Sequence, residues 1–487
     1  MPSRLTSHLQ WVSHDTTQRP EAALLHARVS AETVSKSTVT EVPLHDPPLA
    51  VREEVVYLLH IASEVEHALM VQYLYAVFSL GGPMGATDKA EQVKRWRESI
   101  ATVAREEMGH LATVQNILQL IGGPITFDRE DFPIPSDMYP FPFTLEPLTL
   151  ASLGKYVLAE RPSDEDLEKA GLLKEIQAIE KTVHWTTTGH VNRVGALYTQ
   201  VLNLLDNMAA DDFEPDSFRY QARSAEWGLG QQDLLIETAT SRKAAKTAIA
   251  LIAEQGEGAT LDPTQPQAGP SHFMRFLHIY RELSKVDWAP AQPVPINPTT
   301  KQNGVRNPMD AERCWPDADP ARSQSEAERA TANSEGQTPI LHPVSRRWAQ
   351  LSNVRYHMLL RYLTHSFRTE SVLDAVSRNT PRGLLVSWAF GEMYNLRSLG
   401  AILAALPLDE TGDETCRAGL PFEMPYSLAL PDREQDRWRV HRDAIATSAF
   451  LIGCLLEKAT GREREYLIGL QHLDQTALNS IIPIIAG

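Results

Sequence analysis

Apolar residues along most of the chain recur every three or four positions, which is the period of an α-helix with one buried face. The pattern predicts helices near residues 51–80, 91–121, 149–160, 165–180, 187–206, 241–255 and 271–283. After a gap it returns near 345–368, 381–406, 433–459 and 461–484. Alternating strand patterns are nearly absent. We therefore predict an all-α fold.

Segments without helical periodicity divide these helices into parts. Residues 1–48 are polar and close with "PLHDPP", which indicates an extended N-terminal arm. Residues 286–342 are rich in Pro, Asn and Ser, which is typical of a connecting segment. Between them we expect a helical domain at 49–285, and after them a C-terminal helical bundle at 343–487.

Composition narrows the class of protein. The 487 residues are 43% hydrophobic and 22% charged, as expected of a globular protein with a sizeable core. A net charge of −16 argues against nucleic-acid binding. We find no apolar core of a secretory signal and no apolar run of the roughly 20 residues that span a membrane. Cys314, Cys416 and Cys454 are far apart, so we expect no disulfide and a cytoplasmic location.

Two predicted helices carry charged residues on their apolar stripes. Glu107 and His110 lie on a stripe that runs from Ile100 to Ile121, whereas Glu106 falls on another face. In the preceding helix, Glu66 is the only charge on its apolar face. A buried carboxylate is normally paired or binds metal, and Glu-x-x-His places an oxygen and a nitrogen ligand one turn apart. The pattern favours half of a di-metal site; a buried Glu–His ion pair is the alternative.

Several motifs together resemble one family. "SEVEHALMVQYLYAVFSL", "EEMGHLATVQNIL", "AEQGEG" and "SHFMRF" are similar to the ferritin-like domain of iminophenyl-pyruvate dimer synthases, of the violacein- and rebeccamycin-pathway type, within the ferritin-like superfamily. The resemblance covers about residues 50–285 and implies a ferritin-like four-helix bundle. It implies Glu66, Glu107 and His110 as metal ligands. From the "EQGEG…SH" region it suggests Glu257 and His272, with Glu254 weaker; a turn residue and a helix-start histidine are the alternatives.

The third helix departs from the family pattern. Many ferritin-like relatives place a carboxylate just before a Leu/Phe–Tyr pair, but here Ala196 stands there, in "VGALY". A missing ligand would leave an asymmetric di-metal site or a single metal. Glu160 and His190 are candidate substitutes, and a purely structural role is open for both.

The second half of the chain repeats the first in a degraded form. Ser63–Phe78 aligns without gaps to Ser352–Phe367, and residues 107–111 align to 392–396. Arg355 then replaces Glu66 and Asn395 replaces His110, so Arg355 would form a bidentate salt bridge with the retained Glu392. We predict a second, degenerate bundle without metal; chance similarity of two amphipathic helices is the alternative.

These observations favour a non-haem iron oxidase or oxygenase with one or two iron ions per chain and dioxygen as co-substrate. The resemblance implies an amino-acid-derived or imine substrate, aromatic in the leading interpretation, in specialised metabolism. Tyr73 is the candidate catalytic residue, and a core tyrosine is the alternative. An imine-coupling enzyme without a redox step and a non-catalytic metal-binding scaffold remain open, as does a homodimer.

Overall fold

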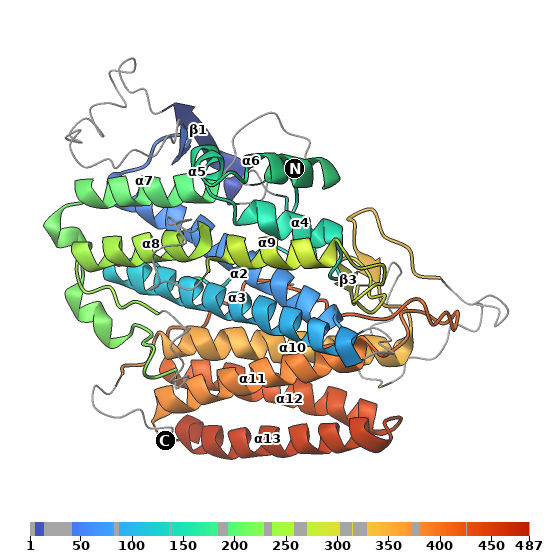
Figure 1. The fold of residues 1–487 in the computed structure, drawn as a ribbon. Coiled ribbons are helices and arrows are strands. Elements are labelled where there is room, and N and C mark those ends of the chain that lie inside the picture. Colours follow the sequence, from blue (N-terminus) through green and yellow to red (C-terminus); the bar gives the residue numbers. More distant parts are fainter. Residues whose placement is uncertain are drawn as a thin grey trace.

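A computed structural model describes residues 5–13, 41–81, 87–135, 139, 141–183, 193–227, 236–257, 270–301, 314, 329–371, 380–424 and 426–486. Helices dominate these residues, and the predicted all-α fold is confirmed (Figure 1). The sheets among them are small. Strands β1 (Leu9–Ser13) and β2 (Glu41–His45) pair antiparallel, and β3 (Pro298–Thr299) and β4 (Thr338–Pro339) pair parallel.

The first group of helices is built on a long hairpin. Helix α2 (Val51–Ser79) packs against α3 (Thr87–Leu120) and α7 (Arg193–Asn207). Helix α9 (His272–Leu283) packs against α3, α4 (Leu150–Ala159) and α8 (Arg242–Glu257), and α8 also packs against α3 and α7. The short 3₁₀ helices are η1 (Thr6–His8), η3 (Ala210–Asp212) and η4 (Pro215–Arg219).

One predicted helix is divided. Residues 165–180 were expected to form a single helix, but the structure has α5 (Asp164–Lys169) and α6 (Leu173–Thr182). Gly171 between them has a φ of +71°, a left-handed conformation that glycine adopts at little cost and that ends a helix. The apolar period continues across the break, which is why the pattern alone did not locate it.

The second group of helices lies beside the first. It comprises α10 (Pro343–Ser366), α11 (Pro381–Leu403), α12 (Glu434–Leu456) and α13 (Gly461–Ala486). Figure 1 shows these helices, in orange and red, on one side of α2 and α3. Helix α10 packs on α11 and α12, α12 packs on α13, and α11 reaches α2.

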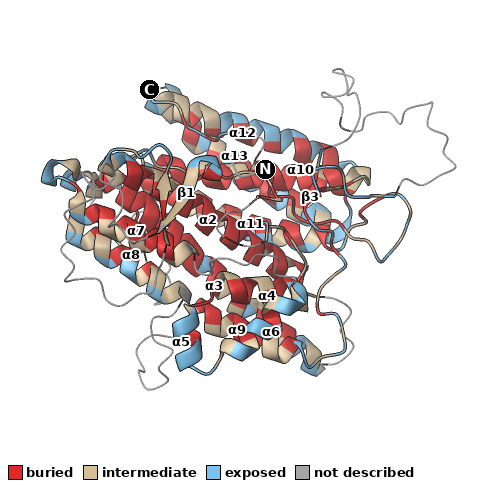
Figure 2. Cartoon of the chain, turned by 90° about the horizontal axis from the view of Figure 1, so that it is seen from above, coloured by how far each residue is buried: buried red, intermediate tan, exposed pale blue. Residues whose placement is uncertain are grey.

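Helix α2 is buried almost all round because it lies between the two groups (Figure 2). The side of α2 that faces the second group of helices contacts α10, where the Tyr356 hydroxyl and His67 Nε2 are 2.5 Å apart. Glu54, Glu64 and Glu66 are all buried on it. Glu54 accepts hydrogen bonds from backbone N–H groups near the end of the N-terminal arm, and Glu64 accepts one from Glu130 N. The carboxylate of Glu66 has a different environment, described below.

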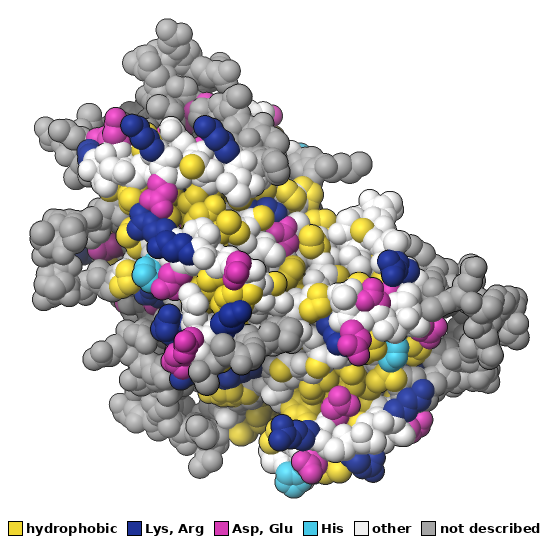
Figure 3. Space-filling model, turned by 45° about the vertical axis from the view of Figure 1, so that its right-hand side comes forward, with side chains coloured by type: hydrophobic (Ala, Val, Ile, Leu, Met, Phe, Trp, Pro, Cys, Tyr) yellow, Lys and Arg dark blue, Asp and Glu magenta, His cyan; other side chains and the backbone are white. Residues whose placement is uncertain are grey.

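The surface carries both signs of charge. On the face drawn in Figure 3, acidic and basic side chains are interspersed among apolar and neutral ones, so the negative charge is spread on that face rather than gathered in one run. None of the helices in the described ranges is long and apolar enough to cross a membrane.

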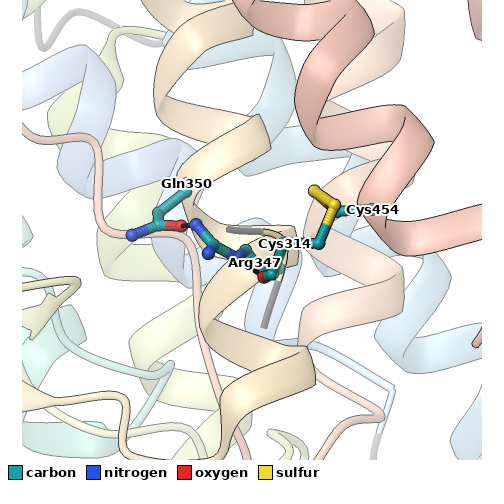
Figure 4. Close-up of a disulfide and its surroundings, with 4 residues drawn as sticks. All are labelled: Cys314, Arg347, Gln350 and Cys454. Atoms are coloured by element: carbon teal, nitrogen blue, oxygen red, sulfur yellow. Dashed lines mark hydrogen bonds between the residues drawn. A yellow bond between two sulfur atoms is a disulfide. The ribbon is translucent and has the colours of Figure 1, made fainter. Parts of the chain in front are cut away.

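The expectation that the chain has no disulfide was wrong. Cys314 and Cys454 are bonded, with their Cα atoms 4.9 Å apart (Figure 4). Cys416 is free. The bond joins residues 140 positions apart, so their spacing in the sequence does not reveal it. Arg347 on α10 donates to Cys314 O at 2.8 Å beside the bond. The case for a reducing compartment rested on unpaired cysteines and loses that support.

Candidate metal centre

Five buried side chains with metal-ligand atoms converge inside the first group of helices. Glu66, Glu107 and His110 form one set whose nearest ligand atoms all lie within 4.8 Å of one another. Glu107, Glu160 and His272 form a second such set. Glu107 belongs to both, so the two triads share one carboxylate.

Each side chain is brought there by a specific point on its helix. Glu107 and His110 are three residues apart on α3, which places both on one face. Glu160 is the C-cap of α4, with its N–H donating to Tyr156 O at 3.2 Å. His272 is the first residue of α9, after Ser271, whose hydroxyl accepts from Met274 N. The two members of the second triad that lie outside α3, Glu160 and His272, are therefore both supplied by helix ends.

The first triad is held from both sides. His110 Nδ1 lies 3.0 Å from Glu107 Oε2 and 3.5 Å from Glu66 Oε2. On the other side of the ring, His110 Nε2 contacts Gln255 Oε1 at 2.8 Å. The hydroxyl of Tyr198 on α7 donates to Glu66 Oε1. The Nδ1 atom therefore faces the two carboxylates, whereas Nε2 is fixed by an amide.

The second triad has the same arrangement. His272 Nδ1 lies 2.8 Å from Glu107 Oε1 and 3.7 Å from Glu160 Oε2, and its Nε2 contacts Glu106 Oε2 at 3.0 Å. The hydroxyl of Tyr73 donates to Glu160 Oε1 at 2.5 Å. In both triads a histidine presents Nδ1 to two carboxylates, and a tyrosine hydroxyl binds the carboxylate that is not shared.

Glu106 corrects the sequence analysis, which placed it on a different face, away from the site. It is only 3% exposed and lies between His272 and Arg275, whose guanidinium binds both of its oxygens at 2.6 and 3.1 Å. An oxygen acceptor on the far nitrogen fixes the tautomer and orientation of a ligating histidine. Glu106 for His272, and Gln255 for His110, have that position.

The donor set fits a pair of metal ions. Carboxylate oxygens and imidazole nitrogens are the ligands of non-haem iron. His272 Nδ1 is buried and lacks hydrogen-bond geometry despite its close carboxylate, as expected of an atom aimed at a metal position. A cavity of about 30 Å³ borders Glu66, Glu107, His110 and Glu160, which is room for one or two water-sized species.

In the metal-free chain, the surrounding carboxylates favour the protonated form of both histidines. Burial alone would lower the pKa of His110, but the carboxylates of Glu107 and Glu66 raise it to about 10. Burial likewise opposes protonation of His272, yet Glu107 and Glu106 raise its pKa well above the usual value. Burial, reinforced by Glu107, raises the pKa of Glu66 to about 7. In the metal-free chain, the carboxylates thus lie against two imidazolium side chains at the positions where metal ions would bind.

These pKa values predict that metal binding releases protons. A ligating histidine must be neutral, so at pH 7–8 each metal displaces a proton, and metal affinity rises with pH toward about 10. Conversely, stability that protonated His110 gives the metal-free fold is complete below pH 6.5 and is lost as pH rises through about 10. Calorimetric metal titrations in buffers of different ionisation enthalpy measure the release; a His110→Asn chain should release about one proton fewer.

The remaining predicted residues lie elsewhere or outside the description. Glu254 is exposed on α8 and takes no part. The side chain of Glu257, the last residue of α8, and the whole of His190 lie outside the described residues. Ala196 is buried and offers no ligand. Glu160, one of the two candidate substitutes, lies in the second triad, and Tyr73 lies against it.

The second group of helices has a salt bridge at the corresponding positions. Arg355 Nε and Nη2 donate to the two oxygens of Glu392 at 2.6 and 2.5 Å, the bidentate pair predicted from the sequence. Arg355 Nη1 also donates to Asp474 and Ser448, at 2.5 and 3.1 Å. Asn395 donates to Glu392 Oε2 at 3.0 Å, in the place of His110. One guanidinium therefore pairs with both buried carboxylates, Glu392 and Asp474.

Residues 59–281 match the family model described as "Ferritin-like". Over 463 residues the chain is 26% identical to dichlorochromopyrrolate synthase of Lentzea aerocolonigenes, covering 85% of this chain and 40% of that protein. Over 281 residues it is 25% identical to 2-imino-3-(indol-3-yl)propanoate dimerase of Chromobacterium violaceum, which covers 52% of this chain and 24% of that protein.

The resemblance to dimer synthases seen in the sequence is confirmed by these comparisons. Both relatives are enzymes, and the chain spans two fifths or less of their lengths. No solved structure matches the chain significantly.

Proposed function

We propose that this chain is a non-haem di-iron enzyme that uses dioxygen to oxidise an amino-acid-derived, aromatic imine and promotes its coupling. One observation carries the proposal: two buried carboxylate–histidine triads share Glu107 and border a small cavity. Similarity to a dimerase of an indolyl imine supports the substrate class. Glu66, Glu107 and His110 would bind one iron, and Glu107, Glu160 and His272 the other.

The bound iron would supply dioxygen activation and a Lewis acid. The chain's own residues prepare for this. Burial, together with the neighbouring charges of Glu160 and Glu66, keeps the pKa of Tyr73 and Tyr198 well above the usual value, so both hydroxyls stay protonated and orient the carboxylates. The cavity suits a diatomic gas but not an aromatic ring, which needs several hundred cubic ångströms. An aromatic substrate therefore requires the described cavity to open.

Iron content tests the centre first. A chain purified with iron and freed of loosely bound ions should contain two irons per chain. One iron per chain would replace the proposed pair with the single-metal site that Ala196 suggests. Absence of iron, with other divalent metals also absent, would contradict the metal centre and favour the imine-coupling interpretation or a scaffold without metal.

Turnover then tests the chemistry. Aromatic imines generated in situ by an amino-acid oxidase, with catalase present, are supplied to the chain, and dioxygen uptake and product mass are followed. The proposal expects uptake above the oxidase background together with a dimeric product. A dimer without extra uptake supports the imine-coupling alternative. If there is no dimer and no extra uptake, an enzymatic role on these imines is contradicted.

We further propose that residues 343–487 are a degenerate repeat of the first bundle that binds no metal. The Arg355–Glu392 pair and the matching Asn395 support this. Residues 1–48 and 286–342 then serve as an arm and a connecting segment, as the sequence suggests, and a cytoplasmic location remains a prediction.

A further inference from the structure

Helices α12 and α13 share an outer surface from which charge is missing. Residues 444–456 of α12 contain no charged side chain. Residues 466–486 of α13 contain one, Asp474, which is buried and bound to Arg355. In the whole chain 22% of residues are charged. We call the exposed side chains of these two stretches the neutral face.

Large apolar side chains are concentrated on the neutral face. Phe450 is 39% exposed, Ile468 50%, Leu473 56% and Ile482 50%. These are four of the eight exposed large hydrophobic residues in the described part of the chain. Ala446 and Ala449 are exposed between them on α12 and allow another backbone to approach closely. Interface cores differ from ordinary surface in this way, by loss of charge and gain of large apolar groups.

The location and size of the neutral face suit a protein partner. Helices α12 and α13 form the outer edge of the second bundle, and no described element covers them (Figures 1 and 2). The uncharged part of α13 is about 30 Å long, and two helices side by side are about 20 Å wide. The uncharged part of α12 is about 20 Å long, so the two stretches together present about 500 Å², below the roughly 800 Å² that each partner buries in a standard interface and within the range of weaker complexes.

We propose that the neutral face binds a second copy of this chain, so that two α12–α13 hairpins pack as a four-helix layer about a two-fold axis. The charge balance selects this occupant. Two molecules that each carry a net charge of −16 repel one another, and contact costs least where neither presents a charge. A face without charge also offers nothing to attract an oppositely charged partner. A two-fold interface is self-complementary, and a face that mixes apolar side chains with uncharged polar ones such as Gln475 and Asn479 meets its own copy without opposing charges.

The oligomeric state tests the proposal, independently of metal and activity. Sedimentation equilibrium of the full chain over a wide dilution series should show a dimer. Ile468 and Ile482 lie on one stripe of α13, and an Ile468→Glu, Ile482→Glu chain should dissociate to monomer, with Kd raised at least about 100-fold, since each copy would bury two unpaired charges. An Ile296→Glu chain changes an equally exposed isoleucine outside the neutral face and should stay dimeric.

Hydrogen exchange separates loss of dimerisation from loss of folding. In the double variant, amides of α12 and α13 should exchange faster at the neutral face, whereas those of α2 and α3 should keep wild-type rates. A monomeric wild-type chain at every concentration would overturn the proposal. So would a double variant that dimerises as tightly as wild type, because another surface would then hold the copies together.

Discussion

A Glu107→Gln chain is expected to lose both metal ions, not one. The Glu107 carboxylate lies against His110 in one triad and His272 in the other, so its charge serves both positions. Removing a group that only orients a metal ligand costs about 10–100-fold in metal affinity, and removing a shared ligand should cost more at each position. Metal analysis after iron loading and gel filtration measures this. Glutamine keeps the size of the side chain, so helicity should be unchanged.

The second bundle supplies a matched control for this experiment. Glu392→Gln makes the same change at the corresponding position, where the carboxylate is bound by Arg355. Its iron content should equal that of the wild-type chain. Metal retained in Glu107→Gln but lost in Glu392→Gln would reverse the assignment of the two bundles. Loss of only one metal in Glu107→Gln would show that the carboxylate is not shared.

The second large effect is expected at Arg355, and it is one of stability. Arg355→Met would leave the buried carboxylates of Glu392 and Asp474 without their cation. Removing one partner of a buried ion pair costs about 3–5 kcal/mol. Urea unfolding monitored by circular dichroism should show a loss of that size in the transition of the second bundle, while the first bundle keeps its iron.

Two further variants isolate the cause. A triple change, Arg355→Met with Glu392→Leu and Asp474→Leu, removes all three charges and should recover most of the stability, because packed apolar residues replace buried ion clusters at little cost. Arg397→Met removes an exposed arginine from the same bundle and should alter stability by less than about 0.5 kcal/mol. If the single Arg355 change were as mild, the salt bridge would not hold this core together.

Periodicity predicted the α3 part of the centre because those residues are local. Glu107 and His110 are separated by one turn of one helix, so their common face can be read without knowledge of the fold. Glu66 on α2 was found in the same way. The Arg355–Glu392 pair was predicted because two aligned helices preserve their relative register. In each case the needed information lies within a helix or a hairpin.

The residues that the sequence did not assign depend on long-range packing. Glu106 appeared to face away because a single apolar stripe was expected of α3, yet helices on several sides bury more than one of its faces. Gln255 and Tyr198 come from α8 and α7, and only the packed bundle brings them to His110 and Glu66. The one available signal was the polar Gln255 next to candidate Glu254.

The disulfide shows the same limit more strongly. Cys314 and Cys454 belong to the connecting segment and to α12, and no local pattern joins positions 140 residues apart. Gly171 is a milder case, since a glycine inside a helical period is compatible with both a continuous and a broken helix.

The protonated histidines of the centre also bear on whether the chain folds before or after metal uptake. In the metal-free chain, protonated His110 and His272 each supply a positive charge among carboxylates that would otherwise repel one another. In the second bundle, Arg355 supplies this positive charge permanently, because a guanidinium keeps its proton. Under the proposed function, we therefore expect a newly synthesised chain to fold in the absence of iron and to take up metal afterwards, in exchange for the protons of His110 and His272.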